Sequence, residues 1–220
     1  MAVTGTKTVN KIVTYALRKA GVAAWNETPA SDDASAAMDE LNLMLKGWQN
    51  KGYNLWTKTG GSLALTTAAS YTLSPVRPLR ILSARLKRSG TETPMYEMTR
   101  QEYDELPNKT STGLPTQFYY DRQREAAKLY VWPVLSTAAG ETVEYTYERE
   151  LEDIAALSDT IDVPGEWWDA VVYNLAARIA ETVGLPRPPT LIMRAAELLR
   201  EAGAFDREES VYFVGDEWRY

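Results

Sequence analysis

The segment GEWWDAVVYNLAARIAETVGLP, residues 165–186, decides how the rest of the chain is interpreted. It begins with two adjacent tryptophans, and apolar residues then recur at helical spacing. Pro164 suits the start of a helix, and Gly184 followed by Pro186 suits its end. The apolar stripe of this predicted helix consists of Trp168, Val171, Val172, Leu175, Ile179 and Val183. Such a stripe needs apolar partners from elsewhere in the chain.

Three further segments with helical periodicity can supply those partners. The first spans residues 9–20, with Thr8 as a cap and Gly21 in the position of a C-terminal glycine. A second, longer helix is predicted from Ser31 or Asp32 to the sequence NKGYN. A last helix is predicted to follow residues 188–189 and to end at a glycine, Gly203.

The region between the second and third predicted helices changes to a period of two, which is typical of strands. Two strands are expected on either side of a turn at Gly60 and Gly61. Further strand patterns follow in ASYTLS, LRILSARLKR, PMYEMT, PTQFYYDRQREAAKLYVWP and ETVEYTYER, with a short helical turn in RQEYDEL. Prolines stand mainly at the strand ends, where a missing amide does least harm. The pattern predicts a small antiparallel β module.

The order of these elements predicts an α+β fold. It consists of an antiparallel bundle of about four helices, an inserted small antiparallel β module and an extended C-terminal tail. The bundle is expected from residues 1–53 and 160–203, the β module from 54–159 and the tail from 204–220. Trp167 and Trp168 would then lie where the bundle meets the sheet. Because adjacent helix positions point about 100° apart, one of the two should contact the β module or a neighbouring subunit.

Composition excludes several classes of function. The 220 residues include no cysteine and no histidine, so thiolate catalysis, a Ser-His-Asp triad and a histidine zinc site are excluded. No phosphate-binding loop and no calcium-loop pattern is present. We therefore expect a structural or binding protein without catalytic, cofactor or metal residues. No apolar run is long enough to span a membrane, and no signal peptide is evident.

Charge is distributed unevenly along the chain. Residues 1–140 carry 17 basic and 12 acidic side chains, whereas residues 141–220 carry 7 basic and 18 acidic ones. Either these are solvated helix faces, or one end of the molecule is acidic for a functional reason. The basic stretch 77–88 can contact phosphate, but on a strand Arg85 and Lys87 share one face and form a small patch at best.

Tyrosine and tryptophan are unusually abundant, with 13 and 7 copies against 3 phenylalanines. These residues favour interfaces, because they bury a large area and keep a polar group. Trp167, Trp168, Trp132 and Tyr119 are therefore candidates for a subunit or module interface. The tail carries Tyr212, Phe213, Trp218 and Tyr220 without a helical or strand period. It resembles a segment that becomes ordered on a partner; the alternative is a tail folded back on its own helices.

Two blocks of the sequence resemble the head–tail adaptor proteins of tailed, and more narrowly short-tailed, phages. These proteins are also called head-completion or packaged-DNA-stabilisation proteins. One block is TKTVNKIVTYALRKAGV followed by DDASAAMDELNLMLKGWQNKGYNLW, and the other is DVPGEWWDAVVYNLAARIAETVG with its NLAxRIA pattern. Together they cover about half of the chain, roughly residues 6–58 and 160–203.

The resemblance implies a structural protein of the virion, assembled in the host cytoplasm and placed at the head–tail junction. It implies a ring of twelve subunits beneath the portal protein that extends the DNA channel, helps to retain packaged double-stranded DNA and docks a downstream tail or nozzle protein. It also implies that the tail, with Tyr212, Phe213, Trp218 and Tyr220, reaches the portal.

Two other functions remain open on the residues alone. A carboxylate-based cell-wall hydrolase would need a glutamate–aspartate pair within about 10 Å across a cleft. A small DNA-binding regulator would bind DNA with a steep salt dependence, whereas an acidic channel wall would show a flat one. The negative net charge and the lack of a basic helix count against the regulator.

Overall fold

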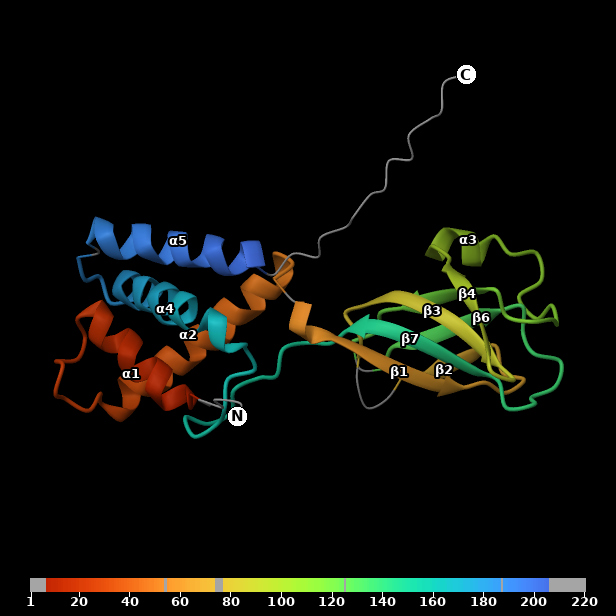
Figure 1. Ribbon diagram of the computed structural model, residues 1–220, viewed down its shortest axis with the longest axis horizontal. Helices are drawn as coiled ribbons and strands as arrows, with labels where there is room; N and C mark the ends of the chain where they lie inside the picture. The colour runs from red at the N-terminus through yellow and green to blue at the C-terminus, as the bar shows by residue number, and fades with distance from the viewer. Residues whose placement is uncertain (1–6, 54, 74–76, 125, 187, 206–220) are drawn as a thin grey trace, which may run out of the picture. The chain divides into compact units, whose positions relative to one another are not determined.

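The computed structural model describes residues 7–53, 55–73, 77–124, 126–186 and 188–205 (Figure 1). Its α-helices are α1 Val9–Ala20, α2 Ser31–Asn50, α3 Arg100–Asp104, α4 Trp168–Thr182 and α5 Pro189–Phe205, with 3-10 turns η1 Leu55–Thr57 and η2 Gly165–Trp167. Its strands are β1 Lys58–Ala64, β2 Ser70–Thr72, β3 Arg80–Arg88, β4 Thr91–Glu97, β5 Gln117–Asp121, β6 Lys128–Trp132 and β7 Thr142–Glu148. The chain divides into two compact units, with the boundaries after Trp56 and after Leu151. We call them the helical unit and the sheet unit.

The end of α1 and the start of α2 have different local causes. Helix α1 ends as expected at Gly21, which adopts the left-handed conformation with φ 83°. Helix α2 begins at Ser31, but its N-cap is Ala30 and no side chain caps it. Asp32 and Asp33 in its first turn instead favour the positive end of the helix dipole.

Helix α4 lies in the middle of the helical unit, because α1, α2 and α5 each pack against it. Its small and branched residues are buried around most of its circumference: Ala170, Val171, Val172, Leu175, Ala176, Ile179 and Ala180. A helix that is apolar on nearly all sides is buried among its neighbours. The predicted four-helix bundle is therefore wrong as a description: three helices surround one, and α5 packs on α4 and η2.

The NLAxRIA pattern is explained by contacts that α4 makes on two sides. The Asn174 side-chain amide donates to the carbonyl of Ala170 at 2.8 Å and to that of Ala195 on α5 at 2.9 Å. Arg178 forms an ion pair with Glu40 on α2 at 3.3 Å. The polar residues of the pattern thus join α4 to two neighbours, while its apolar residues fill the core.

Gly203 does not end the last helix, contrary to the sequence-based prediction. Helix α5 continues through it to Phe205. A β-carbon at position 203 would lie 2.5 Å from the Tyr53 ring, so glycine is required there for packing. This glycine lets α5 lie close to the aromatic residues that follow α2.

The sheet unit contains one seven-stranded sheet that curls strongly, with the strand order β1-β7-β3-β4-β5-β6-β2 (Figure 1). The predicted small antiparallel module is wrong, since the sheet is larger and β4 and β5 pair in parallel. Parallel neighbours need a long crossover, and α3 with the loop after it provides that connection between β4 and β5. The core of the sheet includes Phe118, Leu129, Val131 and Val143.

The expected hairpin at Gly60 and Gly61 is also absent, because β1 runs straight through both glycines. Gly61 pairs with Tyr145 on β7, and the Tyr145 ring covers it. A β-carbon at position 61 would lie 2.5 Å from that ring. Glycine here permits an aromatic ring to lie over the backbone of a strand and does not form a turn.

Strand β3 departs from the simple alternation expected of it. Ile81, Ala84 and Leu86 are buried, although Ile81 should face the opposite side from the other two. The pairing of β3 with β7 shifts register between Ile81 and Ser83, which is a bulge or a similar irregularity. The irregularity brings both parts of the strand to the same core.

No helix in the described part of the chain is both long enough and apolar enough to cross a membrane.

Candidate functional site

Trp167, a predicted interface residue, lies in the core of the helical unit and is 1% exposed. Its ring contacts Trp48, Tyr53 and Trp56, with ring centroids 5.3 to 5.6 Å apart. The indole of Trp56 in turn donates to the carbonyl of Asp162 at 3.1 Å. This aromatic cluster joins the end of α2 to the start of α4, so the contacts of Trp167 are made inside its own unit.

Trp168 points in a different direction from Trp167 and is partly exposed. Its ring lies beneath Lys7, whose ammonium group is 4.9 Å from the ring centroid. The indole nitrogen of Trp168 is buried and has no hydrogen-bond acceptor among the described residues. The two tryptophans thus face different surroundings, as their spacing predicts.

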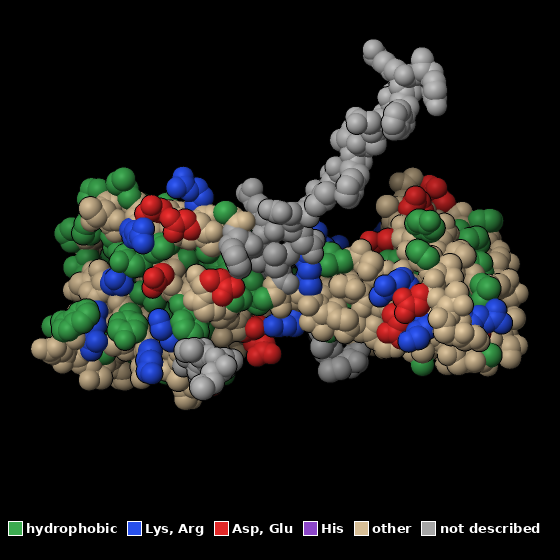
Figure 2. Space-filling view, in the orientation of Figure 1, with side chains coloured by type: hydrophobic (Ala, Val, Ile, Leu, Met, Phe, Trp, Pro, Cys, Tyr) green, Lys and Arg blue, Asp and Glu red, His purple; other side chains and the backbone are tan. Residues whose placement is uncertain are grey.

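A groove of about 360 Å³ opens between the outer face of α1 and the start of α4. We call it the α1–α4 groove, and its lining consists of Lys7, Tyr15, Arg18, Lys19, Trp25, Asp169 and Val172. Figure 2 shows lysine and arginine side chains interspersed with hydrophobic ones over this part of the helical unit. The groove is basic and aromatic, and a single carboxylate lines it.

Cations in and beside the groove stack on aromatic rings. Arg18 lies 5.9 Å from the centroid of the Trp25 ring, and Lys19 lies 4.0 Å from that of Tyr173. Trp25 is nevertheless 76% exposed and Tyr15 is 40% exposed. The sequence-based interface candidates did not include Trp25 or Tyr15. The signal was the helical spacing of Tyr15 with Arg18 and Lys19.

Tyr119 and Trp132, the other predicted interface residues, lie in the sheet unit. Tyr119 stacks on Tyr103 of α3 at 5.1 Å and on Tyr130 at 5.7 Å, and its burial raises the pKa of its hydroxyl. Trp132 is half-buried and donates to the carbonyl of Asn108 at 3.0 Å. Both residues hold the β4–β5 crossover against the sheet. Their role in a subunit interface stays a prediction.

The four arginines of the basic stretch 77–88 each pair with a neighbouring carboxylate. Arg80 donates to both carboxylate oxygens of Glu148 at 2.7 Å, which raises the pKa of the arginine. The other pairs are Arg77 with Glu150 at 2.8 Å, Arg85 with Glu92 at 3.4 Å and Arg88 with Glu141 at 3.3 Å. Such pairing leaves little positive charge for phosphate and disfavours the DNA-binding regulator.

Buried carboxylates in the sheet unit have structural partners. Glu141 and Glu148 are each 3% exposed, and each pairs with an arginine. No cluster of acidic residues suited to a metal ion occurs in the described part of the chain. These carboxylates therefore stabilise strands, and their geometry provides no support for the hydrolase alternative.

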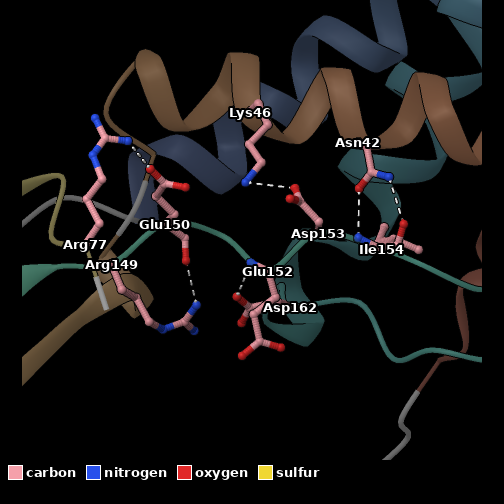
Figure 3. A network of polar contacts seen from close by, with 9 residues as sticks. All are labelled: Asn42, Lys46, Arg77, Arg149, Glu150, Glu152, Asp153, Ile154 and Asp162. Carbon is pink, nitrogen blue, oxygen red and sulfur yellow. Dashed lines mark hydrogen bonds and ion pairs between the residues drawn. The ribbon is translucent and has the colours of Figure 1, made fainter. Parts of the chain in front are cut away.

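The segment after Leu151 is fixed to α2 within the helical unit (Figure 3). The Asn42 side chain donates to the carbonyl of Ile154 and accepts from its amide, both at 3.0 Å. Lys46 forms an ion pair with Asp153 at 3.0 Å. On the sheet-unit side, Figure 3 shows Arg77 and Arg149 bound to Glu150. Polar contacts within each unit thus fix the chain just before and just after the boundary at Leu151.

The tail residues Tyr212, Phe213, Trp218 and Tyr220 lie outside the described residues. Their assignment to a portal contact remains a prediction.

Comparison with known proteins identifies the family. The family model described as SU10 adaptor protein matches residues 8–211, which is most of the chain. The chain belongs to the SU10 adaptor protein family. The resemblance to phage head–tail adaptors drawn from the sequence is thereby confirmed at this level. Membership of an adaptor family also favours a structural role in a virion over catalysis.

Comparison with solved structures aligns this chain with one from a particle neck. It is a chain in the neck of an empty GTA particle, computed with C6 symmetry, and it is 16% identical with a TM-score of 0.30. The match covers 97% of both chains. The family assignment does not rest on this likeness. A search of curated proteins finds no match.

Proposed function

We propose that the protein is a head–tail adaptor that forms a ring of twelve subunits beneath the portal of a phage, a short-tailed one by the sequence resemblance. The observation that carries the proposal is the family match over residues 8–211. In this role the ring extends the DNA channel, helps to retain the packaged DNA and docks a downstream tail or nozzle protein. The absence of cysteine and histidine suits such a part.

The acidic excess in the last third of the chain supports a position of the ring around the DNA channel. Residues 141–220 carry 18 acidic side chains against 7 basic ones. An acidic channel wall repels DNA phosphates, so the duplex can slide through without being held. This arrangement predicts that DNA binding by the pure protein is weak and changes little with salt concentration.

The tail, residues 204–220, is the proposed contact with the portal, through Tyr212, Phe213, Trp218 and Tyr220. Anchoring many copies side by side raises the effective concentration of the subunits for one another. Weak contacts between subunits then suffice to close a ring. The adaptor alone should therefore remain monomeric, and the ring should assemble on the portal.

The test mixes the purified adaptor with the candidate portal and follows the mixture by sedimentation and electron microscopy. We expect a slow-sedimenting adaptor alone, and ring density at one end of the portal in the mixture. A matched pair of variants is Trp218→Ala, which should reduce ring formation, and Tyr96→Ala, at an exposed aromatic position of the sheet unit, which should retain it. A stable dodecamer of the adaptor alone, or no complex at all, would contradict the proposal.

A further inference from the structure

The α1–α4 groove has the composition of a binding site for an anionic and aromatic segment. Lys7, Arg18 and Lys19 outnumber its single carboxylate, Asp169. Trp25 and Tyr15 present aromatic surface to solvent along the same groove. Large exposed aromatic residues beside cations are typical of surfaces that a partner covers.

Two buried donors have no acceptor among the described residues: the Nε of Arg18, which lines the groove, and the Nε1 of Trp168, whose ring lies beneath Lys7 of the lining. A buried donor that is left unpaired is unfavourable, so such groups are usually satisfied. Both are donors, and an occupant that pairs with them must supply oxygen acceptors. Carboxylates and peptide carbonyls have this chemistry.

The chain itself contains a segment of matching chemistry. Residues 206–220, DREESVYFVGDEWRY, carry five acidic side chains, two arginines and four aromatic ones. Its acidic residues complement the cations of the groove, and its aromatic residues complement Trp25 and Tyr15. No other separate segment of this length in the sequence combines a net charge of −3 with four aromatic residues.

The position of α5 brings this segment within reach. Helix α5 packs against η2 near its own C-terminal end, where Gly203 adjoins Tyr53, and Tyr53 contacts Trp167. Trp168, the next residue, lies beneath Lys7 at the groove. Fifteen extended residues span roughly 50 Å, whereas α4 is only about 22 Å long. A segment tethered at this short range has a high effective concentration, which favours its own groove over that of a second copy.

We propose that residues 206–220 dock in the α1–α4 groove of their own chain while the protein is free. The acidic side chains pair with Arg18 and Lys19, and the aromatic ones lie against Trp25 and Tyr15. The inference deepens the proposed function and rests on it in one respect: the portal would draw the same segment out of the groove. Docking itself requires no portal, so its test is independent of the portal test.

The absence of cysteine from the chain makes disulfide trapping a clean experiment. The full-length double variant Asn26→Cys with Ser210→Cys places one thiol beside Trp25 and one within the segment. In the control, Ser35→Cys on the exposed surface of α2 replaces Asn26→Cys. Under mild oxidation without portal, we expect the first pair to cross-link within one chain at least five-fold faster than the control pair.

Charge reversal separates docking from random encounter. Adding Lys19→Glu, or adding Trp25→Ala, should lower the cross-linking rate several-fold, and so should high salt. Lys51→Glu, an exposed reversal outside the groove, should not change it. Circular dichroism verifies that each variant is folded.

Three results would overturn the inference. Equal rates for the two cysteine pairs would exclude docking at the groove. Cross-links between two chains, seen as dimers on a non-reducing gel, would assign the groove to a second copy. Intramolecular cross-linking that is unaffected by Lys19→Glu and by Trp25→Ala would show that the groove does not hold the segment.

Discussion

At the scale of single residues, Trp167 and Trp168 show how neighbours in the sequence take different roles. Trp167 fills the core of the helical unit, in contact with Trp48, Tyr53 and Trp56. Trp168 instead lies under Lys7 at the α1–α4 groove. Their divergence was predictable from the angle between adjacent helical positions. Which of the two is buried was not, because that depends on where η2 ends and α4 begins.

Replacing Trp167 should therefore be costly for stability. Trp167→Ala removes a ring that is 1% exposed and leaves a cavity among three aromatic neighbours. We expect the free energy of unfolding of the helical unit to fall by about 3–5 kcal/mol. The measurement is urea unfolding followed by tryptophan fluorescence. Met193→Ala, at a position 71% exposed in the same unit, is the control and should change stability by less than about 0.5 kcal/mol. Equal effects of the two substitutions would contradict this account.

The role of a glycine can be predicted from the sequence only where it depends on local neighbours. Gly21 was placed correctly, since a left-handed residue after a periodic helix has a local signature. Gly61 and Gly203 were misread as a turn and a helix end, because the rings that require them, Tyr145 and Tyr53, are distant in the sequence. A glycine required by a distant side chain leaves no local pattern.

At the scale of elements, β7 owes part of its stability to ionised carboxylates at and before it. Glu141 accepts from the backbone amide of Ala139 at 2.7 Å and pairs with Arg88, and these contacts lower the pKa of its carboxyl. The hydroxyl of Ser62 on β1 donates to Glu144 at 2.8 Å and likewise lowers the pKa of that carboxyl. Both groups bind protons less readily in the folded chain than in the unfolded one.

Acid should weaken this strand first. A carboxyl whose folded pKa is depressed stabilises the fold fully above its unfolded pKa of about 4.5, and that stabilisation is lost as the pH falls below it. We expect hydrogen exchange of the β7 amides to accelerate, beyond the intrinsic pH effect, between about pH 4.5 and pH 3. Glu141→Gln should weaken protection at pH 7 and flatten this acid dependence, whereas Glu97→Gln, at an exposed position, should do neither. An unchanged acid dependence in Glu141→Gln would refute the role of this carboxyl.

Most elements were predictable because each has a local period. Helices α1, α2, α4 and α5 and most strands match the segments predicted from helical or alternating spacing. Strand β3 shows what spacing misses. Its register shift between Ile81 and Ser83 moves the buried positions from one alternation to the other, and only its pairing with β7 reveals this.

At the scale of the whole molecule, the sheet unit has a core of its own. Phe118, Leu129, Val131 and Val143 are among its buried residues, and each is at most 2% exposed. The sequence predicted an inserted β region, but not its strand order or its parallel β4–β5 pair. Pairing of distant strands depends on tertiary packing, which a local period does not encode. The arrangement of helices around α4 was missed for the same reason.

The sheet unit should fold when it is produced alone. A unit with its own apolar core is expected to be independently stable. A fragment of residues 57–151 should give a dispersed amide NMR spectrum and a cooperative thermal transition. Leu129→Ala, at a position with no exposed surface, should lower or abolish that transition. A fragment that gives a collapsed spectrum without any transition would mean that the sheet requires the helical unit to fold.

The first and last strands of the sheet unit lie side by side. Strands β1 and β7 pair along their length from Lys58 and Glu148, and the amide of Arg149 donates to the carbonyl of Thr57 at 3.0 Å. The chain therefore leaves this unit next to the point where it came in. Residues 57–151 form a cassette that can be excised and replaced by a short glycine–serine bridge, or grafted between related adaptors, with both cut ends already side by side.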